Sequence, residues 1–126
     1  MKINVNCHKL KSSLAVALLL LASVAGAANT VRIFNLSADE WARPRSGDVI
    51  PELASVRAAV SYWGRGVDAL VVIRHPGEDS GELWAAELRD WLISLGVPSD
   101  YIRLTPGTQQ ADEIKLVVGS RDELEQ

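Results

Sequence analysis

The sequence of 126 residues has little of the chemistry that disulfides, metals and cofactors need. It contains one cysteine, Cys7, and two histidines, His8 and His75. A single thiol cannot form an intramolecular disulfide, so the hydrophobic core has to hold the fold together. Two imidazoles leave mainly carboxylates to complete a metal site, which is a weak donor set for a transition metal. We therefore expect no bound metal and no cofactor.

The first 27 residues have the three parts of a secretory signal peptide. Three lysines precede an apolar run at 14–25, and small residues follow up to Ala27. This run is shorter than the roughly 20 apolar residues of a membrane-spanning helix. Cys7 precedes the run, whereas a lipoprotein would need its cysteine directly after the small residues. We expect cleavage near Ala27, a periplasmic or secreted protein, and no membrane span after cleavage.

The residues that follow this segment are acidic. Because the leader holds three lysines and no acid, residues 28–126 keep 10 Lys and Arg against 16 Asp and Glu. An acidic domain gains nothing from the counterion release that drives nucleic-acid binding, and an anionic membrane surface repels it. We expect one domain at 28–119, an acidic flexible tail at 120–126, and no nucleic-acid partner.

The apolar patterns predict elements in the order β-α-β-α-β-β. Alternation at period two indicates a strand with one buried face, and a continuous apolar run indicates a central strand. Pro51 suits the first turn of one helix, while Asp79 or Ser80 caps the next helix and Gly96 ends it. Polar segments at 37–49 and 105–112 are expected to be loops. The expected strands are 31–36, 69–73, 101–104 and 114–118, and the expected helices are 51–63 and 79–95.

Two helices with one apolar face each can cover one side of a four-stranded sheet. We therefore predict the α/β class, as a two-layer sandwich with a mixed sheet of four strands and two helices on one face. The first β-α-β crossover is expected to place its two strands parallel. Trp63, Trp84 and Trp91 fall on the apolar helix faces and are expected in the core.

The central strand at 69–73 runs into Arg74 and His75, the sharpest local signal of chemistry. An apolar strand ending in Arg-His-Gly presents the nucleophile of histidine phosphatases, but here Pro76 separates His75 from Gly77. That chemistry also needs a second histidine and further arginines around the phosphate, whereas His8 lies in the leader and leaves His75 as the one histidine of residues 28–126. Two alternatives stay open beside it: a ligand-binding site at Arg74 and His75, and a plain strand end before a Pro-Gly turn.

The segment 41–45, Trp-Ala-Arg-Pro-Arg, is the most unusual polar stretch. A tryptophan there is exposed to water unless it packs back or meets a partner. Tryptophan and arginine are the residue types enriched at interaction hot spots. Two alternatives stay open, namely a tryptophan folded over the sheet edge or a helix, and a partner-binding site formed by Trp41, Arg43 and Arg45.

Residues 87–102, Glu-Leu-Arg-Asp-Trp-Leu-Ile-Ser-Leu-Gly-Val-Pro-Ser-Asp-Tyr-Ile, resemble the C-terminal peptidoglycan-binding domain of the OmpA-like family. That family has a long helix ending in leucine, then Gly-Ile or Gly-Val, a short loop and a strand that begins with isoleucine. The order of elements over 31–118 also agrees. The family holds the peptidoglycan stem peptide with an aspartate of a Thr-Asp motif and an arginine on the helix. Here the strand is followed by residues 74–77, Arg-His-Pro-Gly, and Trp84 takes roughly the place of that arginine, so the resemblance implies a scaffold without the family's binding motif.

These observations predict a small exported, non-enzymatic envelope protein with a degenerate OmpA-like domain that binds a protein partner in the periplasm. One alternative is a peptidoglycan-binding domain with a non-standard site that includes Arg74 and His75. A further alternative is a phosphatase or hydrolase that depends on His75.

Overall fold

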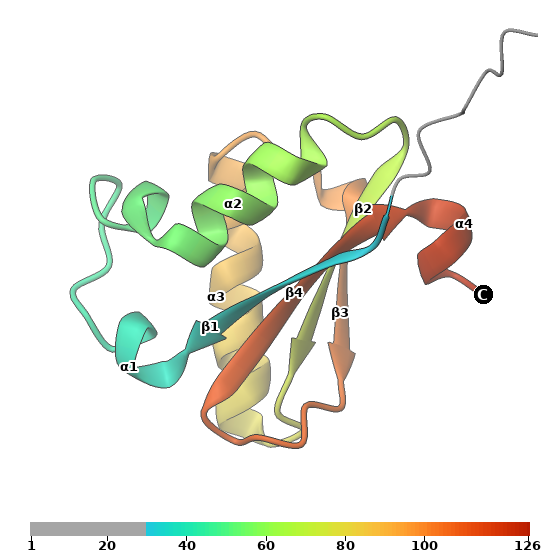
Figure 1. Ribbon diagram of the computed structural model, residues 1–126. Coiled ribbons are helices and arrows are strands. Elements are labelled where there is room, and N and C mark those ends of the chain that lie inside the picture. Colours follow the sequence, from blue (N-terminus) through green and yellow to red (C-terminus); the bar gives the residue numbers. More distant parts are fainter. Residues whose placement is uncertain (1–29) are drawn as a thin grey trace, which may run out of the picture.

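The computed structural model describes residues 30–126, and the predicted signal peptide at 1–27 lies outside the described residues. Four strands form one mixed sheet in the order β1-β4-β2-β3 (Figure 1). Strand β4 runs antiparallel to both β1 and β2, and β3 runs parallel to β2. Strands β1 and β2 are therefore parallel to each other, as the first crossover predicts. The strands are β1 (Arg32–Ser37), β2 (Ala69–His75), β3 (Ile102–Pro106) and β4 (Glu113–Ser120).

Two long helices, α2 (Ala54–Trp63) and α3 (Asp79–Ser94), cover one face of this sheet (Figure 1). Helix α2 packs against β1 and β4, and helix α3 packs against β2 and β3. The predicted α/β class, with a four-stranded mixed sheet and helices, is confirmed. Within residues 30–126, no helix is both long enough and apolar enough to cross a membrane.

The hydrophobic core lies between the two helices and the sheet, because alternate strand residues point to that side. Strand β4 buries Ile114, Leu116 and Val118 there, and α3 buries Leu88 and Leu92. Burying such a side chain contributes roughly 1.5–3 kcal/mol relative to leaving it in water. The core also includes Leu36 of β1, so it connects the first and the last strand with both helices.

The structure differs from the prediction at the ends of several elements. The predicted loop at 37–49 begins with the short helix α1 (Ala38–Trp41), for which Ser37 and Glu40 form a capping box. Helix α3 follows Glu78 without any side-chain cap, so the predicted cap at Asp79 or Ser80 is wrong. Gly96 has φ 102°, which fits its predicted place after the helix. The structure also has two 3₁₀ helices, η2 (Ile50–Glu52) and η3 (Ser99–Tyr101).

The opposite face of the sheet carries the short helix α4 (Arg121–Leu124) at one end (Figure 1). The sequence predicts a flexible acidic tail over 120–126, and the structure instead places a helical turn there. Ser120 and Glu123 form a capping box that satisfies backbone groups of this turn. The rest of this face is called the open face below.

Candidate functional site

Trp41 is turned into the protein. Its side chain is 7% exposed and stacks on Trp84, with ring centroids 6.1 Å apart. The guanidinium of Arg45 lies over the Trp41 ring at 5.1 Å, donates to the Trp41 carbonyl oxygen at 2.7 Å, and pairs with Glu87 at 2.7 Å. The structure therefore matches the folded-back alternative for this segment. Of the three residues predicted to bind a partner, Arg43 and Arg45 are exposed, and Arg45 is engaged by Trp41 and Glu87.

Arg74 and His75 do not form one site, because neighbouring residues of a strand point to opposite faces of the sheet. His75 lies on the helix side and is 3% exposed. Its Nδ1 is 2.8 Å from the carbonyl oxygen of Pro76, which can only accept, so Nδ1 carries the proton. Arg74 is exposed on the open face. A nucleophilic role for His75 would require a buried imidazole to reach a phosphate ester.

Arg74 lies beside a polar hollow of about 340 Å³ at one end of the open face. Lys115 is its direct cross-strand partner on β4, so two cations stand side by side. Lys115 Nζ is 3.8 Å from a carboxylate oxygen of Glu113, whereas no carboxylate of residues 30–126 reaches Arg74 at ion-pair distance. The hollow is lined by Arg74, Gly107, Thr108, Gln109, Gln110 and Lys115.

The loop that walls this hollow is fixed to the end of β2. The backbone N–H groups of Gly107 and Thr108 both donate to the carbonyl oxygen of His75, at 3.0 and 3.3 Å. The Thr108 hydroxyl donates to the carbonyl oxygen of Gln110 at 3.1 Å. The loop backbone is thus held beside Arg74, and cations together with the side-chain amide donors of the loop suit an anionic group.

A second hollow, of about 250 Å³, adjoins Arg74 on the other side. Leu70 and Val72 form its floor, and Leu124 of α4 and Arg103 of β3 border it. The open face thus carries three cations around an apolar floor. Arg103 and Lys115 pair with Glu125 and Glu113, and Arg74 has no ion pair within residues 30–126. The guanidinium of Arg74 is therefore the group on this face that is open to a carboxylate of a partner.

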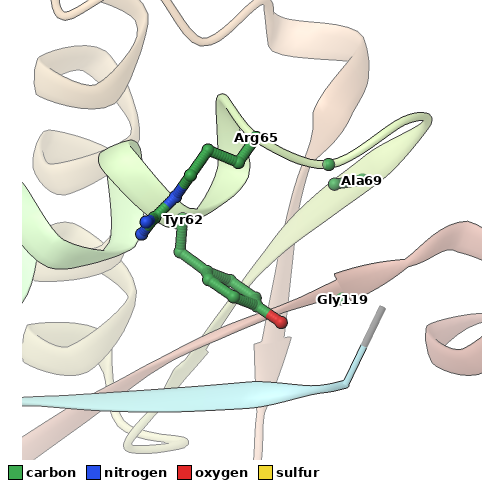
Figure 2. A pocket seen from close by; sticks show the side chains of 5 residues that line it. Tyr62, Arg65, Ala69 and Gly119 are labelled. Carbon is green, nitrogen blue, oxygen red and sulfur yellow. The ribbon is translucent and has the colours of Figure 1, made fainter. Parts of the chain in front are cut away.

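A third, small hollow of about 50 Å³ lies at the end of α2 (Figure 2). Figure 2 shows the Tyr62 ring reaching from α2 toward Gly119 of β4, with Arg65 beside it. The other lining residues are Gly66 and Ala69, so the surface is mainly apolar. A hollow of this size holds a few waters and is far smaller than the roughly 300 Å³ of a small-molecule site.

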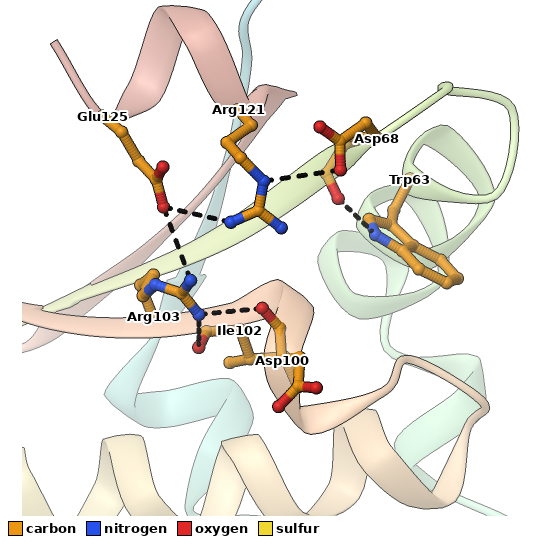
Figure 3. A network of polar contacts seen from close by, with 8 residues as sticks. Trp63, Asp68, Asp100, Ile102, Arg103, Arg121 and Glu125 are labelled. Atoms are coloured by element: carbon orange, nitrogen blue, oxygen red, sulfur yellow. Dashed lines mark hydrogen bonds and ion pairs between the residues drawn. The ribbon is translucent and has the colours of Figure 1, made fainter.

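A network of ion pairs holds α4 against the sheet (Figure 3). Arg121 lies 3.4 Å from Asp68 and 3.2 Å from Glu125, and Arg103 lies 3.4 Å from Glu125. Partial desolvation lowers the pKa of Arg121, but the hydrogen bond to Asp68 and the nearby carboxylates outweigh it and raise that pKa. The guanidinium also lies 5.7 Å from the centre of the Tyr101 ring. The network fixes one border of the open face.

The described part of the chain contains no group of three or more histidine, cysteine or acidic side chains placed to hold a metal ion. Trp84, in the position that the OmpA-like resemblance gives to an arginine, packs against the core. Its Nε1 is buried without a hydrogen-bond partner among residues 30–126.

The chain matches no family model, no curated protein and no solved structure. The resemblance carried by residues 87–102 therefore stays a hypothesis. The candidate site rests on geometry alone. Sequence reasoning found Arg74 but missed Lys115 and the loop at 107–110, because their proximity depends on strand register.

Proposed function

We propose that this chain is a small exported, non-enzymatic protein of the cell envelope that binds a protein partner in the periplasm. The partner surface is the open face around Arg74, and the partner contributes carboxylates. The pairing of Arg74 with Lys115 beside a polar hollow is the observation that carries this proposal. The signal-peptide pattern supports export, and the absence of a recognised catalytic motif in the sequence favours binding over catalysis.

The physical argument concerns the free energy of the like-charged pair. Two cations directly opposite each other in a sheet destabilise it, by amounts of the order of 0.2–1 kcal/mol. A carboxylate that enters the hollow would remove this repulsion and would accept hydrogen bonds from the Arg74 guanidinium in a bidentate geometry. The alternation of cations and apolar residues on this face suits an acidic protein segment better than a free ion.

Site-specific photo-crosslinking of the full chain in cells that export it tests the proposal. A photoreactive residue replaces exposed Thr105 on the open face, and a matched probe replaces exposed Ala86 on α3. We expect a crosslinked partner from position 105, little from 86, and loss of the product when Arg74→Glu is added. A product that is unchanged by Arg74→Glu, or that forms equally from 86, would place the contact elsewhere.

Peptidoglycan is the second candidate, because exposed Arg74 could pair with a stem-peptide carboxylate. Sedimentation with purified sacculi separates the two functions. Binding of the wild type and its loss in Arg74→Gln, but not in the exposed α3 variant Arg89→Gln, would support it. Protein that stays in the supernatant at low salt would exclude it.

A further inference from the structure

A separate hollow of about 450 Å³ lies between β1 and α2, on the helix side of the sheet. Arg32 and Phe34 of β1 line it together with Ala58 and Tyr62 of α2 and with Arg65, which follows that helix. It is remote from the open face, because Arg32 and Phe34 alternate with Ile33, which points to the opposite side. Whatever occupies this hollow is therefore independent of a partner on the open face.

Two guanidinium groups meet at this hollow. Arg32 lies 5.5 Å and Arg65 lies 5.9 Å from the centre of the Tyr62 ring. Neither arginine has an ion pair within residues 30–126. Arg65 Nε donates to the Ser61 carbonyl oxygen at 3.1 Å, which leaves its two terminal nitrogens for a ligand. Two arginines without an ion pair that line the same hollow can attract a carboxylate.

The two segments that contain Arg32 and Arg65 carry only positive charge. Residues 30–37 and 54–67 contain no aspartate or glutamate, although acids outnumber bases over 28–126. The local field is therefore positive in an otherwise acidic domain, which would attract a negatively charged segment.

Aromatic side chains form the apolar wall of the hollow. The Phe34 and Tyr62 rings lie 6.2 Å apart at 57°, and the Tyr62 hydroxyl donates to the carbonyl oxygen of Thr30. Figure 2 shows Tyr62 directed from α2 toward the start of β1. The ring is thus held between helix and strand, and it can pack against an apolar side chain of a ligand.

Strand β1 is an edge of the sheet, because it pairs with β4 alone. An antiparallel edge strand leaves the N–H and C=O groups of alternate residues unpaired on its outer side. Within residues 30–126, no hydrogen bond from another segment reaches this outer side between Arg32 and Leu36. A peptide that adds a strand here gains main-chain hydrogen bonds, while pockets for alternate side chains supply specificity.

We propose that the outer edge of β1 and the hollow beside it bind an extended acidic peptide segment. The peptide backbone pairs with β1. One carboxylate of the peptide contacts Arg32 and Arg65, and an alternate apolar side chain packs on Phe34 and Tyr62. Two observations favour an acidic peptide: the positive charge of the hollow complements a carboxylate, and the unpaired strand edge beside it belongs to the same strand, β1.

The test is an NMR titration of the ¹⁵N-labelled protein with a capped hexapeptide that alternates valine and glutamate. We expect amide shifts concentrated at 32–36 and 58–65. The double variant Arg32→Gln/Arg65→Gln should bind the peptide at least tenfold more weakly than the wild type. The matched control is Arg57→Gln, an exposed arginine on α2 that pairs with Glu52 at 3.3 Å. Its affinity should change less than twofold.

Three peptide and solution controls decide the mode of binding. A valine–glutamine peptide should bind at least tenfold more weakly, and a peptide with alternate backbone N-methyl groups should not bind. Equal affinity of either peptide, or no shift at β1, would overturn the proposal.

Sedimentation that shows dimers, with the same β1 amides shifting on dilution, would assign the edge to a second copy of this chain. Urea denaturation shows whether each variant is folded. If the double variant is unfolded, the single variants Arg32→Gln and Arg65→Gln are titrated in its place.

Discussion

Arg74 and Lys115 face each other as a direct cross-strand pair on β2 and β4. A chain selected for stability alone would place a carboxylate at one of these positions, because like charges in direct register repel. The pair also borders a polar hollow whose loop is hydrogen-bonded to the end of β2. A carboxylate at position 74 would favour stability, whereas an arginine there favours binding, and a substitution at this position separates the two effects.

The substitution Arg74→Glu is expected to stabilise the protein while it removes binding at the open face. An opposite-charge pair with Lys115 should raise the free energy of unfolding by about 0.2–1 kcal/mol at low salt. Urea denaturation measures this gain. The gain should shrink in 1 M salt, where the Debye length is about 3 Å.

Arg89→Glu is the matched control for Arg74→Glu, because it makes the same charge change at an exposed position of α3. An equal gain from this control would show that the effect is not due to the cross-strand pair.

Trp41→Ala tests whether this tryptophan belongs to the core or to a partner surface. Loss of a ring that is 7% exposed and stacked on Trp84 should cost about 3–5 kcal/mol. The near-UV circular dichroism of the Trp41–Trp84 pair should weaken in the folded variant. Arg43→Ala, in the same segment, should stay within about 0.5 kcal/mol of the wild type. Unchanged stability of Trp41→Ala would contradict the folded-back position.

Gly81→Ala should destabilise the protein although alanine favours helices. A Cβ at Gly81 would lie 2.2 Å from the carbonyl oxygen of Pro76, so α3 or the preceding turn would have to shift. Such overpacking costs about 1–3 kcal/mol, which exceeds the helix-propensity gain of about 1 kcal/mol. Chemical denaturation of this variant measures the balance.

Gly47→Ala provides the comparison, because a Cβ there would meet no atom within 4 Å. It should be neutral or stabilising by up to about 1 kcal/mol. If both alanine variants behaved alike, the close approach of α3 to Pro76 would not limit stability.

Local periodicity predicts the elements of this fold well, because each depends on a few neighbouring residues. The continuous apolar run at 69–73 correctly indicates the central position of β2 between β4 and β3. The same period-two rule places Arg74 and His75 on opposite faces of the sheet, so it argues against the joint site predicted at these two residues. The placement of Lys115 beside Arg74, and of Trp41 on Trp84, depends on register and on long-range packing. No local pattern encodes those contacts.

Helix α4 is expected to open before the rest of the sheet. It is one turn long, and Arg121 holds it through exposed contacts to Asp68 and Glu125, which solvent screens. Arg121→Gln should therefore speed amide hydrogen exchange over 121–125 several-fold, while the amides of Leu116 and Val118 keep their protection. Hydrogen exchange followed by NMR resolves the two sets. Equal acceleration at Leu116 would mean that α4 unfolds only together with β4, so that the border of the open face is as stable as the core.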